Sequence, residues 1–92
     1  MILSFACGRT EELFQTGRSR YFQAIARVAL RKLDQIHIAG ELSDLAVPPG
    51  NRLEALFGDR QGQHSIRIND RWRVCFVWQD GHATRVAIVD YH

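Results

Sequence analysis

The sequence predicts an α+β fold in the order β-α-α-β-β-β, with two N-terminal helices packed on one face of an antiparallel sheet. The main observation is a strict alternation from Trp72 to Trp78, the pattern of a strand with two different faces. One face carries Trp72, Val74, Phe76 and Trp78, and the other carries Arg73, Cys75 and Val77. The second observation is the hairpin signal Asp80-Gly81 directly after this strand. The third is an upstream apolar stripe at helical spacing, formed by Phe22, Ile25, Ala26, Ala29, Leu33 and Ile36.

The segment before the sheet is predicted to hold one short strand and two helices. Ile2–Ala6 is the strand, and Thr10 is the predicted N-cap of a brief helix that ends at Gly17. The longer helix is predicted from about Ser19 to Ile38. Its charged residues are assigned to the solvated surface, namely Arg20, Arg27, Arg31, Lys32 and Asp34.

The second half is predicted to form a loop and then three or four antiparallel strands. Residues 40–51 are irregular because Pro48-Pro49-Gly50 excludes regular structure. A short strand follows at Arg52–Leu56, with Leu53 and Ala55 facing inward. Further strands are predicted at Gln63–Ile68 and Ala83–Tyr91. The helices are expected to cover the aromatic face of this sheet and to leave the other face open.

Composition limits the class of protein. The 92 residues predict a single domain, 1–92, with one modest core. The net charge is only +2, but Lys32 is the single lysine among 12 cations. Arginine favours planar recognition of phosphate and carboxylate, which suits a nucleic acid or an acidic protein partner. The absence of a long apolar run or secretory leader predicts a cytoplasmic protein with no membrane partner.

Metal and redox chemistry are not predicted. Cys7 and Cys75 lack a metal-binding or redox spacing, so both are expected to be small buried hydrophobic residues. No dense group of carboxylates, histidines and cysteines stands out, and the sequence therefore requires no metal or cofactor. On the open face, alternation gathers Ser65, Arg67, Arg73, Val89 and Tyr91 if the strands are in register. Such a face is a reasonable cradle for a phosphate chain and a base.

Several segments together resemble the HigB group of the RelE/ParE toxin superfamily. The resemblance rests on Gly58-Asp59-Arg60, Gly62, Ser65–Asn69, Trp72–Trp78 and Val89-Asp90-Tyr91-His92, preceded by Pro49–Leu56. It covers nearly the whole chain, and the Asp-Tyr-His motif after the Trp-Arg strand is its most specific part. It implies a RelE-like microbial ribonuclease fold and ribosome-dependent cleavage of messenger RNA. It also implies neutralisation by a HigA-like helix-turn-helix antitoxin, with operator DNA bound only through the complex.

The resemblance assigns roles to particular residues. Metal-free cleavage uses the RNA 2′-hydroxyl as nucleophile and needs a base, an acid and cations around the phosphate. The catalytic candidates are Arg73 for the phosphate, Tyr91 for the base, and His92 with Glu54 for proton transfer. The RNA-binding candidates are Arg67, Arg60 and Arg52, while Asp90 and Trp72 are expected to support the site.

Two departures from the family pattern leave alternatives open. Several members have histidine where this chain has Glu54 and lysine where it has Phe57. The chain is then either a weaker nuclease or a binding module that works mainly through its antitoxin, and a gyrase-inhibiting toxin is a third possibility. Each residue also has a structural explanation. Tyr91 is explained as a half-buried strand residue, Arg73 as an ion-pair partner of Glu54 or Asp90, and His92 as a frayed end.

Overall fold

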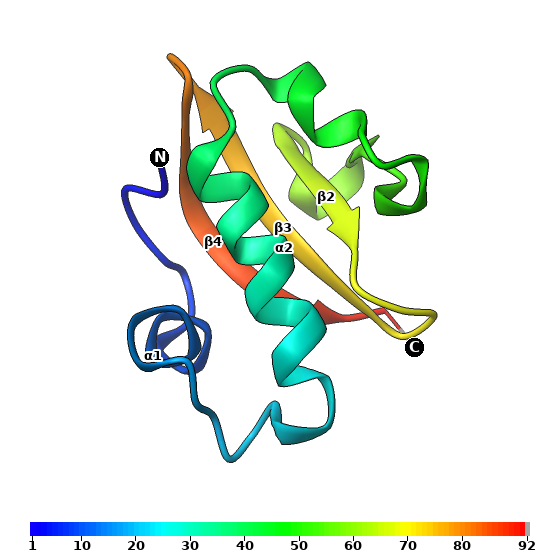
Figure 1. The fold of residues 1–92 in the computed structure, drawn as a ribbon. Coiled ribbons are helices and arrows are strands. Elements are labelled where there is room, and N and C mark those ends of the chain that lie inside the picture. The colour runs from blue at the N-terminus through cyan, green and yellow to red at the C-terminus, as the bar shows by residue number, and fades with distance from the viewer. Residues whose placement is uncertain (92) are drawn as a thin grey trace.

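The computed structural model describes residues 1–91 and contains two α-helices and a four-stranded antiparallel sheet. The helices are α1 (Gly8–Thr16) and α2 (Ala26–Ile38), and the strands are β1 (Glu54–Ala55), β2 (Gln63–Arg67), β3 (Trp72–Gln79) and β4 (His82–Asp90). Short 3₁₀ turns occur at Gln23–Ile25, Leu42–Ala46, Pro49–Asn51 and Gly58–Arg60. The strand order is β1-β2-β3-β4, with α2 lying across the sheet and α1 lying beside β4 (Figure 1). The predicted α+β fold is confirmed. Within the described residues, neither helix is long and apolar enough to cross a membrane.

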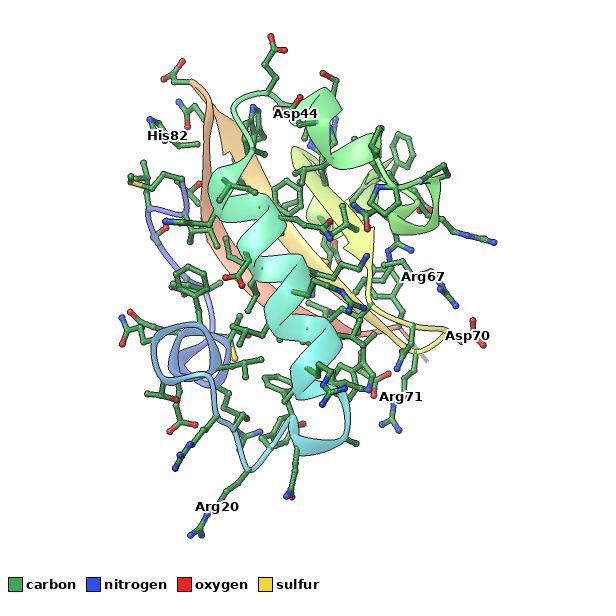
Figure 2. All side chains as sticks on the ribbon, viewed as in Figure 1. Arg20, Asp44, Arg67, Asp70, Arg71 and His82 are labelled. Carbon is green, nitrogen blue, oxygen red and sulfur yellow. The ribbon has the colours of Figure 1, made fainter. Side chains whose placement is uncertain are left out.

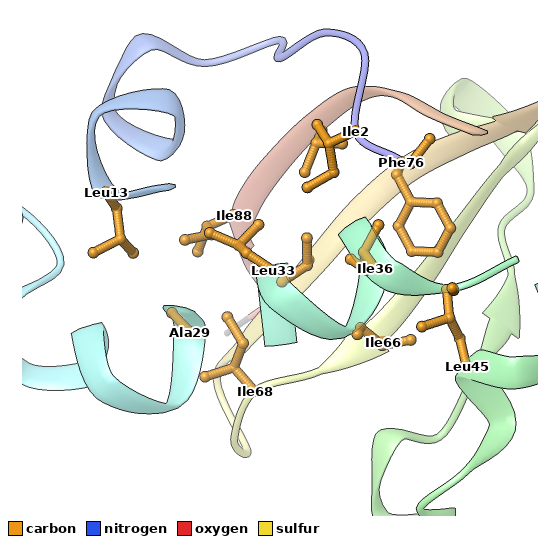
Figure 3. Packing of buried hydrophobic residues seen from close by; sticks show 14 of the residues in the cluster. Ile2, Leu13, Ala29, Leu33, Ile36, Leu45, Ile66, Ile68, Phe76 and Ile88 are labelled. Carbon is orange, nitrogen blue, oxygen red and sulfur yellow. The ribbon is translucent and has the colours of Figure 1, made fainter. Parts of the chain in front are cut away.

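The main core lies between α2 and the sheet, as the two hydrophobic patterns predicted. Ala29, Leu33 and Ile36 on α2 have no exposed surface, and they face the buried side chains of β2, β3 and β4 (Figure 3). The aromatic face of β3 supplies Val74 and Phe76, both fully buried. Burial of such side chains stabilises the fold by roughly 1.5–3 kcal/mol each. The apolar side chains of the alternating strand β3 and of the helical stripe on α2 therefore pack together in one core.

The longer helix is shorter than predicted, because its expected first turns are irregular. The Ser19 hydroxyl accepts a hydrogen bond from the Phe22 N–H at 3.0 Å, the pattern of a helix N-cap. A 3₁₀ turn follows, and regular α2 begins only at Ala26. At α1, the N-cap is Cys7 and not Thr10. Thr10 is instead fully buried, and its hydroxyl accepts the Ile88 N–H at 3.0 Å.

The predicted N-terminal strand is reduced to two isolated parallel bridges with β4, at Ile2–Ala83 and Phe5–Val86. The ladder is interrupted by a β-bulge in β4, where the register against β3 shifts between Cys75 and Val77. Arg85 has a positive φ of 55° there, and its N–H donates to the Ser4 hydroxyl at 2.9 Å. A bulge twists and bends a strand, so the N-terminal segment pairs with β4 only on either side of it.

The opposite face of the sheet is not open at its centre, which corrects the prediction. Ser65 and Cys75 have no exposed surface and Arg73 is only 8% exposed. The chain before β1 reaches Arg73 through the Arg52 carbonyl, and the Tyr91 hydroxyl reaches Cys75. The predicted Arg52–Leu56 strand shortens to Glu54–Ala55, and Ala55 is exposed instead of facing inward. Coverage by these two short segments is not visible in the alternation of β3 alone.

Candidate active site

A groove of about 350 Å³ lies on the face of the sheet opposite α2. It is lined by Arg52, Glu54, Arg67, Asn69, Asp70, Arg73 and Tyr91. The structure thus brings together five of the predicted site residues, from the segment before β1, from β1, β2 and β3, and from the residue after β4. Three arginines face two carboxylates, so the lining carries excess positive charge. This arrangement can hold an anion at the end of the sheet where β2 turns into β3.

Arg73 is held rigidly by one edge of its guanidinium group. Its Nε donates to the Ser65 hydroxyl at 2.8 Å, and its Nη2 donates to the Arg52 carbonyl at 2.6 Å. Glu54 lies 3.9 Å from the same Nη2, which makes a long ion pair. Nη1 makes no hydrogen bond within residues 1–91, and a guanidinium has five N–H donors in a fixed plane. The side chain is therefore preorganised, with one pair of donors left for a ligand.

Arg67 stands directly opposite Arg73 in the β2–β3 ladder. Opposed residues of an antiparallel pair share one face, and like charges in this position repel. Asp70 forms an ion pair with Arg67, but its carboxylate is fully exposed to solvent. Figure 2 shows Arg67 and Asp70 together at the turn after β2. An anion bound between the two arginines would offset this repulsion.

Tyr91 closes the groove and is fixed at two points. Its backbone N–H donates to the Arg71 carbonyl at 2.6 Å, and its hydroxyl lies 3.6 Å from the Cys75 thiol. The Arg73 guanidinium carbon lies 5.9 Å from the centre of the ring, within cation–π range. Burial, followed by the contact with Cys75, raises the pKa of the Tyr91 phenol. The phenol is thus neutral at physiological pH, so it can stack or donate a hydrogen bond but does not act as a base there.

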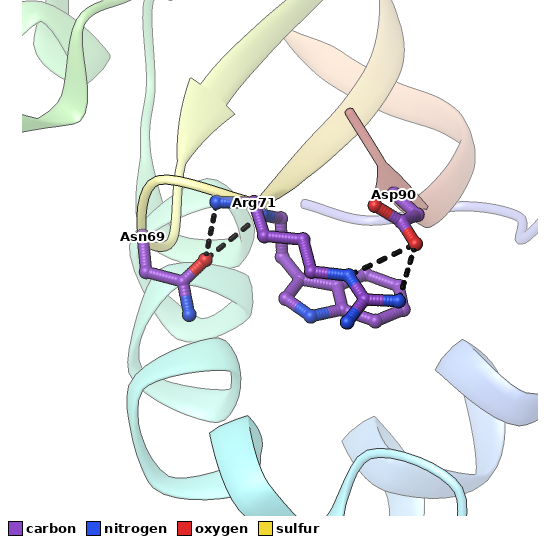
Figure 4. Close-up of polar contacts among 4 residues, drawn as sticks. Asn69, Arg71 and Asp90 are labelled. Carbon is purple, nitrogen blue, oxygen red and sulfur yellow. Dashed lines mark hydrogen bonds and ion pairs between the residues drawn. The ribbon is translucent and has the colours of Figure 1, made fainter. Parts of the chain in front are cut away.

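The turn between β2 and β3 is tied to the end of β4. The Asn69 carboxamide oxygen accepts the Arg71 and Trp72 N–H groups at 2.9 and 2.8 Å. The Arg71 guanidinium donates to the Asp90 carboxylate at 3.0 and 2.8 Å (Figure 4), and that pairing raises the pKa of Arg71. Trp72 packs edge-on against Phe22, with ring centres 5.6 Å apart. Asp90 and Trp72 are thus each held by a neighbour, and Tyr91 comes directly after the anchored carboxylate.

A buried polar network holds the segment that reaches Arg73. Lys32 was predicted to be solvated, but it is only 9% exposed and its ammonium donates to the Asn51 Oδ1 at 2.5 Å. Burial lowers the pKa of Lys32, and nearby Arg31 and Arg67 lower it further. The Asn51 amide donates to the Gln35 Oε1 at 3.0 Å and to the Leu45 carbonyl at 3.1 Å. Because Asn51 precedes Arg52, this network sets the position of the carbonyl that binds Arg73.

The remaining predicted site residues differ in position. Glu54 and Arg52 line the groove, whereas Arg60 lies outside it and donates to the Gln63 Oε1 at 3.4 Å. Phe57 is 84% exposed, so it is not a core side chain. The His92 prediction lies outside the described residues. Within residues 1–91, no group of three or more His, Cys, Asp or Glu residues can hold a metal ion.

Sequence reasoning missed several residues that shape this groove. Asn69 and Asp70 line it directly, and Cys75 and Asn51 hold its walls in place. Both residues fall between the predicted strands Gln63–Ile68 and Trp72–Trp78, but that spacing does not show that they lie near Arg73. No local pattern predicted that Cys75 contacts Tyr91 or that Asn51 binds Lys32, because both contacts join segments far apart in the sequence.

Comparisons with known proteins agree on one class. Residues 3–92 match the family model described as "RelE-like toxin of type II toxin-antitoxin system HigB". The chain is 45% identical to Toxin HigB-1 of Vibrio cholerae over 60 residues, which cover 65% of this chain and 63% of that protein. It is 32% identical to an uncharacterized protein of Haemophilus influenzae over 60 residues, 65% of this chain and 59% of the relative. The match therefore spans less than two thirds of the length of each curated relative.

Solved structures share the fold at low sequence identity. The YoeB-YefM complex from Staphylococcus aureus contains a chain with a TM-score of 0.58 and 20% identity, covering 100% of this chain and 98% of that one. A mutant of YafQ from E. coli has a TM-score of 0.57 and 13% identity, covering 99% of this chain and 94% of that one. At these identities the likeness concerns the arrangement of helices and strands, and the site depends on the residues described above.

Proposed function

Because the chain belongs to the HigB-like family of RelE-like toxins of type II toxin-antitoxin systems, we propose that it cleaves messenger RNA on the ribosome. The observation that carries this proposal is the groove in which Arg67 and Arg73 oppose each other beside Tyr91 and Glu54. Two arginines in register suit a phosphodiester, and the adjacent aromatic ring suits a base. No catalytic metal is needed for this chemistry, since the RNA supplies its own nucleophile.

Each candidate residue is proposed to have one part in the reaction. The 2′-oxygen attacks the adjacent phosphorus and the bond to the 5′-oxygen breaks, which yields a 2′,3′-cyclic phosphate and a 5′-hydroxyl. The free Nη1 edge of Arg73 donates to the phosphate oxygens as negative charge builds up on them. Glu54, half-exposed at 57%, can accept the 2′-hydroxyl proton in its ionised form. His92 can protonate the departing 5′-oxygen, because imidazole titrates near neutral pH.

The proposed partners rest on the family. A HigA-like helix-turn-helix antitoxin would neutralise the toxin, and the complex would bind operator DNA through the antitoxin. An enzyme that acts on messenger RNA at the ribosome works in the cytoplasm. Arg52 and Arg67 would guide the RNA phosphates toward Arg73 because both line the same groove.

The experiment is cleavage in a purified translation system, with the ends of the messages mapped at nucleotide resolution. The parent protein is compared with Arg73→Lys, which keeps the charge but loses the planar fork. New ends that depend on ribosomes and decrease in the variant support the proposal. Inhibited supercoiling by gyrase with intact messages would identify the gyrase-directed alternative. Antitoxin binding without either activity would identify a binding module.

A further inference from the structure

A second hollow, larger than the groove, lies between α1 and the start of α2. Its volume is about 870 Å³, against about 350 Å³ for the groove. Three arginines line it, Arg9, Arg18 and Arg20, together with the single carboxylate of Glu12 and the ring of Tyr21. We call this surface the α1–α2 hollow. Its excess of positive charge has no role in the core, because all three arginines are exposed.

In the α1–α2 hollow, the guanidinium group of Arg9 stacks on the ring of Tyr21. The Arg9 guanidinium carbon lies 3.8 Å from the centre of the Tyr21 ring, and 57% of the Tyr21 surface is exposed. Tyr21 also packs edge-on against Phe22, with ring centres 4.9 Å apart. Arg20 extends away from the ribbon at this end of the molecule (Figure 2). Planar guanidinium and aromatic groups with free arginines beside them suit a nucleotide, with a base on the plane and phosphates on the charges.

The hollow approaches the groove at the end of the sheet, through Phe22, Trp72 and Arg71. Phe22 follows Tyr21 and packs on Trp72, and the Arg71 guanidinium lies 5.1 Å from the Trp72 ring centre. Asp90, chiefly through its hydrogen bond, and to a smaller degree Tyr21 raise the pKa of Arg71, so Tyr21 lies within electrostatic range of that guanidinium. Trp72 directly precedes Arg73 in β3. Successive strand residues point to opposite faces, so the hollow and the groove lie on opposite faces of the sheet. They meet at its end, where Arg71 follows Asp70 of the groove and its carbonyl accepts the Tyr91 N–H.

We propose that the α1–α2 hollow binds the single-stranded RNA backbone outside the cleavage groove, through Arg18, Arg20 and the Arg9–Tyr21 pair. The proposal rests on the ribonuclease function proposed above. The approach to the groove at the end of the sheet favours a longer stretch of the same RNA over an acidic segment of a protein partner. Both ligands are anionic, but only RNA presents bases to the exposed ring while its phosphates continue toward Arg71 and Arg73.

The test measures how binding depends on salt. Two single-stranded RNAs of 4 and 16 nucleotides, with 2′-O-methyl groups that block cleavage, are titrated by fluorescence anisotropy over a range of salt concentrations. The Arg18→Gln/Arg20→Gln protein should lose about 1.4 from the slope of log affinity against log salt for the long RNA, because each single-strand phosphate contact contributes about 0.7. Binding of the short RNA should stay unchanged. The control is Arg31→Gln/Arg85→Gln, which removes the same charge from two exposed arginines that line neither site.

The outcomes separate this proposal from the ribonuclease proposal. Three results would overturn the hollow as an RNA site. They are an unchanged salt slope for the long RNA, an equal loss of slope for both RNAs, and no binding of the long RNA by the parent protein. An unchanged slope together with lost binding of a polyglutamate peptide also overturns it and indicates a protein partner. If messages stay intact while the slope falls as expected, only the cleavage proposal fails. If messages are cut while the slope is unchanged, only the hollow proposal fails.

Discussion

Replacing Arg73 tests the groove and the fold together, and the structure predicts effects on both. Arg73→Ala removes hydrogen bonds to the Ser65 hydroxyl and the Arg52 carbonyl at a side chain that is only 8% exposed. Hydrogen bonds from charged donors contribute about 1.5–3 kcal/mol each, so the loss is about 3 kcal/mol or more. For a domain of this size the expected decrease in Tm is about 12–24 °C. An exposed arginine on an open face would have given almost no change.

The effect on cleavage is predicted from the free Nη1 edge. Loss of one donor to the transition state lowers cleavage by roughly 100- to 1000-fold. The assay is ribosome-dependent cleavage of a defined message, measured below the Tm of the least stable variant. Arg73→Lys should recover part of the stability but little of the activity, because an ammonium group cannot reproduce the planar fork.

A destabilised control separates folding from chemistry. Thr10→Val removes the buried hydroxyl that accepts the Ile88 N–H, which costs about 1–3 kcal/mol, and neither residue lines the groove. We expect it to lower Tm and leave cleavage near that of the parent. If Arg73→Lys cleaves as fast as the parent, or if Thr10→Val loses as much activity as Arg73→Ala, the assignment of Arg73 to the phosphate is wrong.

Three further predictions use other residues. Phe57→Lys should raise cleavage, because it restores the lysine that several family members have at this position. The Tm should change little, because Phe57 is 84% exposed; a large drop in Tm would contradict the exposed position. Tyr91→Phe should leave the shape of the neutral pH–rate profile unchanged, since the pKa of the phenol is raised by burial and by Cys75; a lost basic or acidic limb would show that Tyr91 transfers a proton. The pKa of Lys32 is lowered in the folded protein, mainly by burial, so the unfolded chain binds more protons at this residue. The cost to stability of burying the charged ammonium therefore disappears as the pH rises toward the ordinary pKa of 10.5. Relative to Lys32→Gln, the parent should therefore become more stable with rising pH in denaturant titrations, and a constant difference would contradict the lowered pKa.

The fold was predictable where hydrophobic periodicity was strong. The faces of β3 followed from the alternation between Trp72 and Trp78, and alternation also gathered Arg67 and Arg73 on one face; their direct pairing comes from the structure. The turn at Asp80-Gly81 was equally clear, and both residues have positive φ angles of 53° and 81°, as tight hairpin turns require. These features are local or repeat over few residues, so the sequence specifies them directly.

The features that were missed depend on contacts between distant segments. Burial of Lys32 requires Asn51, 19 positions away, and burial of Arg73 requires the Arg52 carbonyl, 21 positions away. The β-bulge at Arg85 was hidden because its positive φ is carried by an arginine and not a glycine. The open face was predicted wrongly for the same reason, since alternation within one strand gives the direction of a side chain but not what covers it.

The site could be predicted only through the family pattern. Arg73, Tyr91 and Glu54 converge on one groove, but no single one of them is unusual for a strand or an edge. The resemblance named Arg73 and Tyr91 together with His92, and Glu54 stands where several family members have histidine. The structure adds how Arg73 and Tyr91 are held. The contact between Tyr91 and Cys75 had no signal in the sequence. Asp90 was expected to have a supporting role, but Arg71 was not predicted as its partner.

The most direct test of the central claim is the chemistry of the ends of messenger RNA after exposure to the protein on ribosomes. Attack by the 2′-oxygen at the groove predicts a 2′,3′-cyclic phosphate and a 5′-hydroxyl at each cut, with cuts lost when a single 2′-deoxynucleotide is placed at the cleavage position. Both ends should be strongly reduced with Arg73→Lys. Intact messages, or cuts that leave a 5′-phosphate and persist with the 2′-deoxynucleotide, would contradict the account.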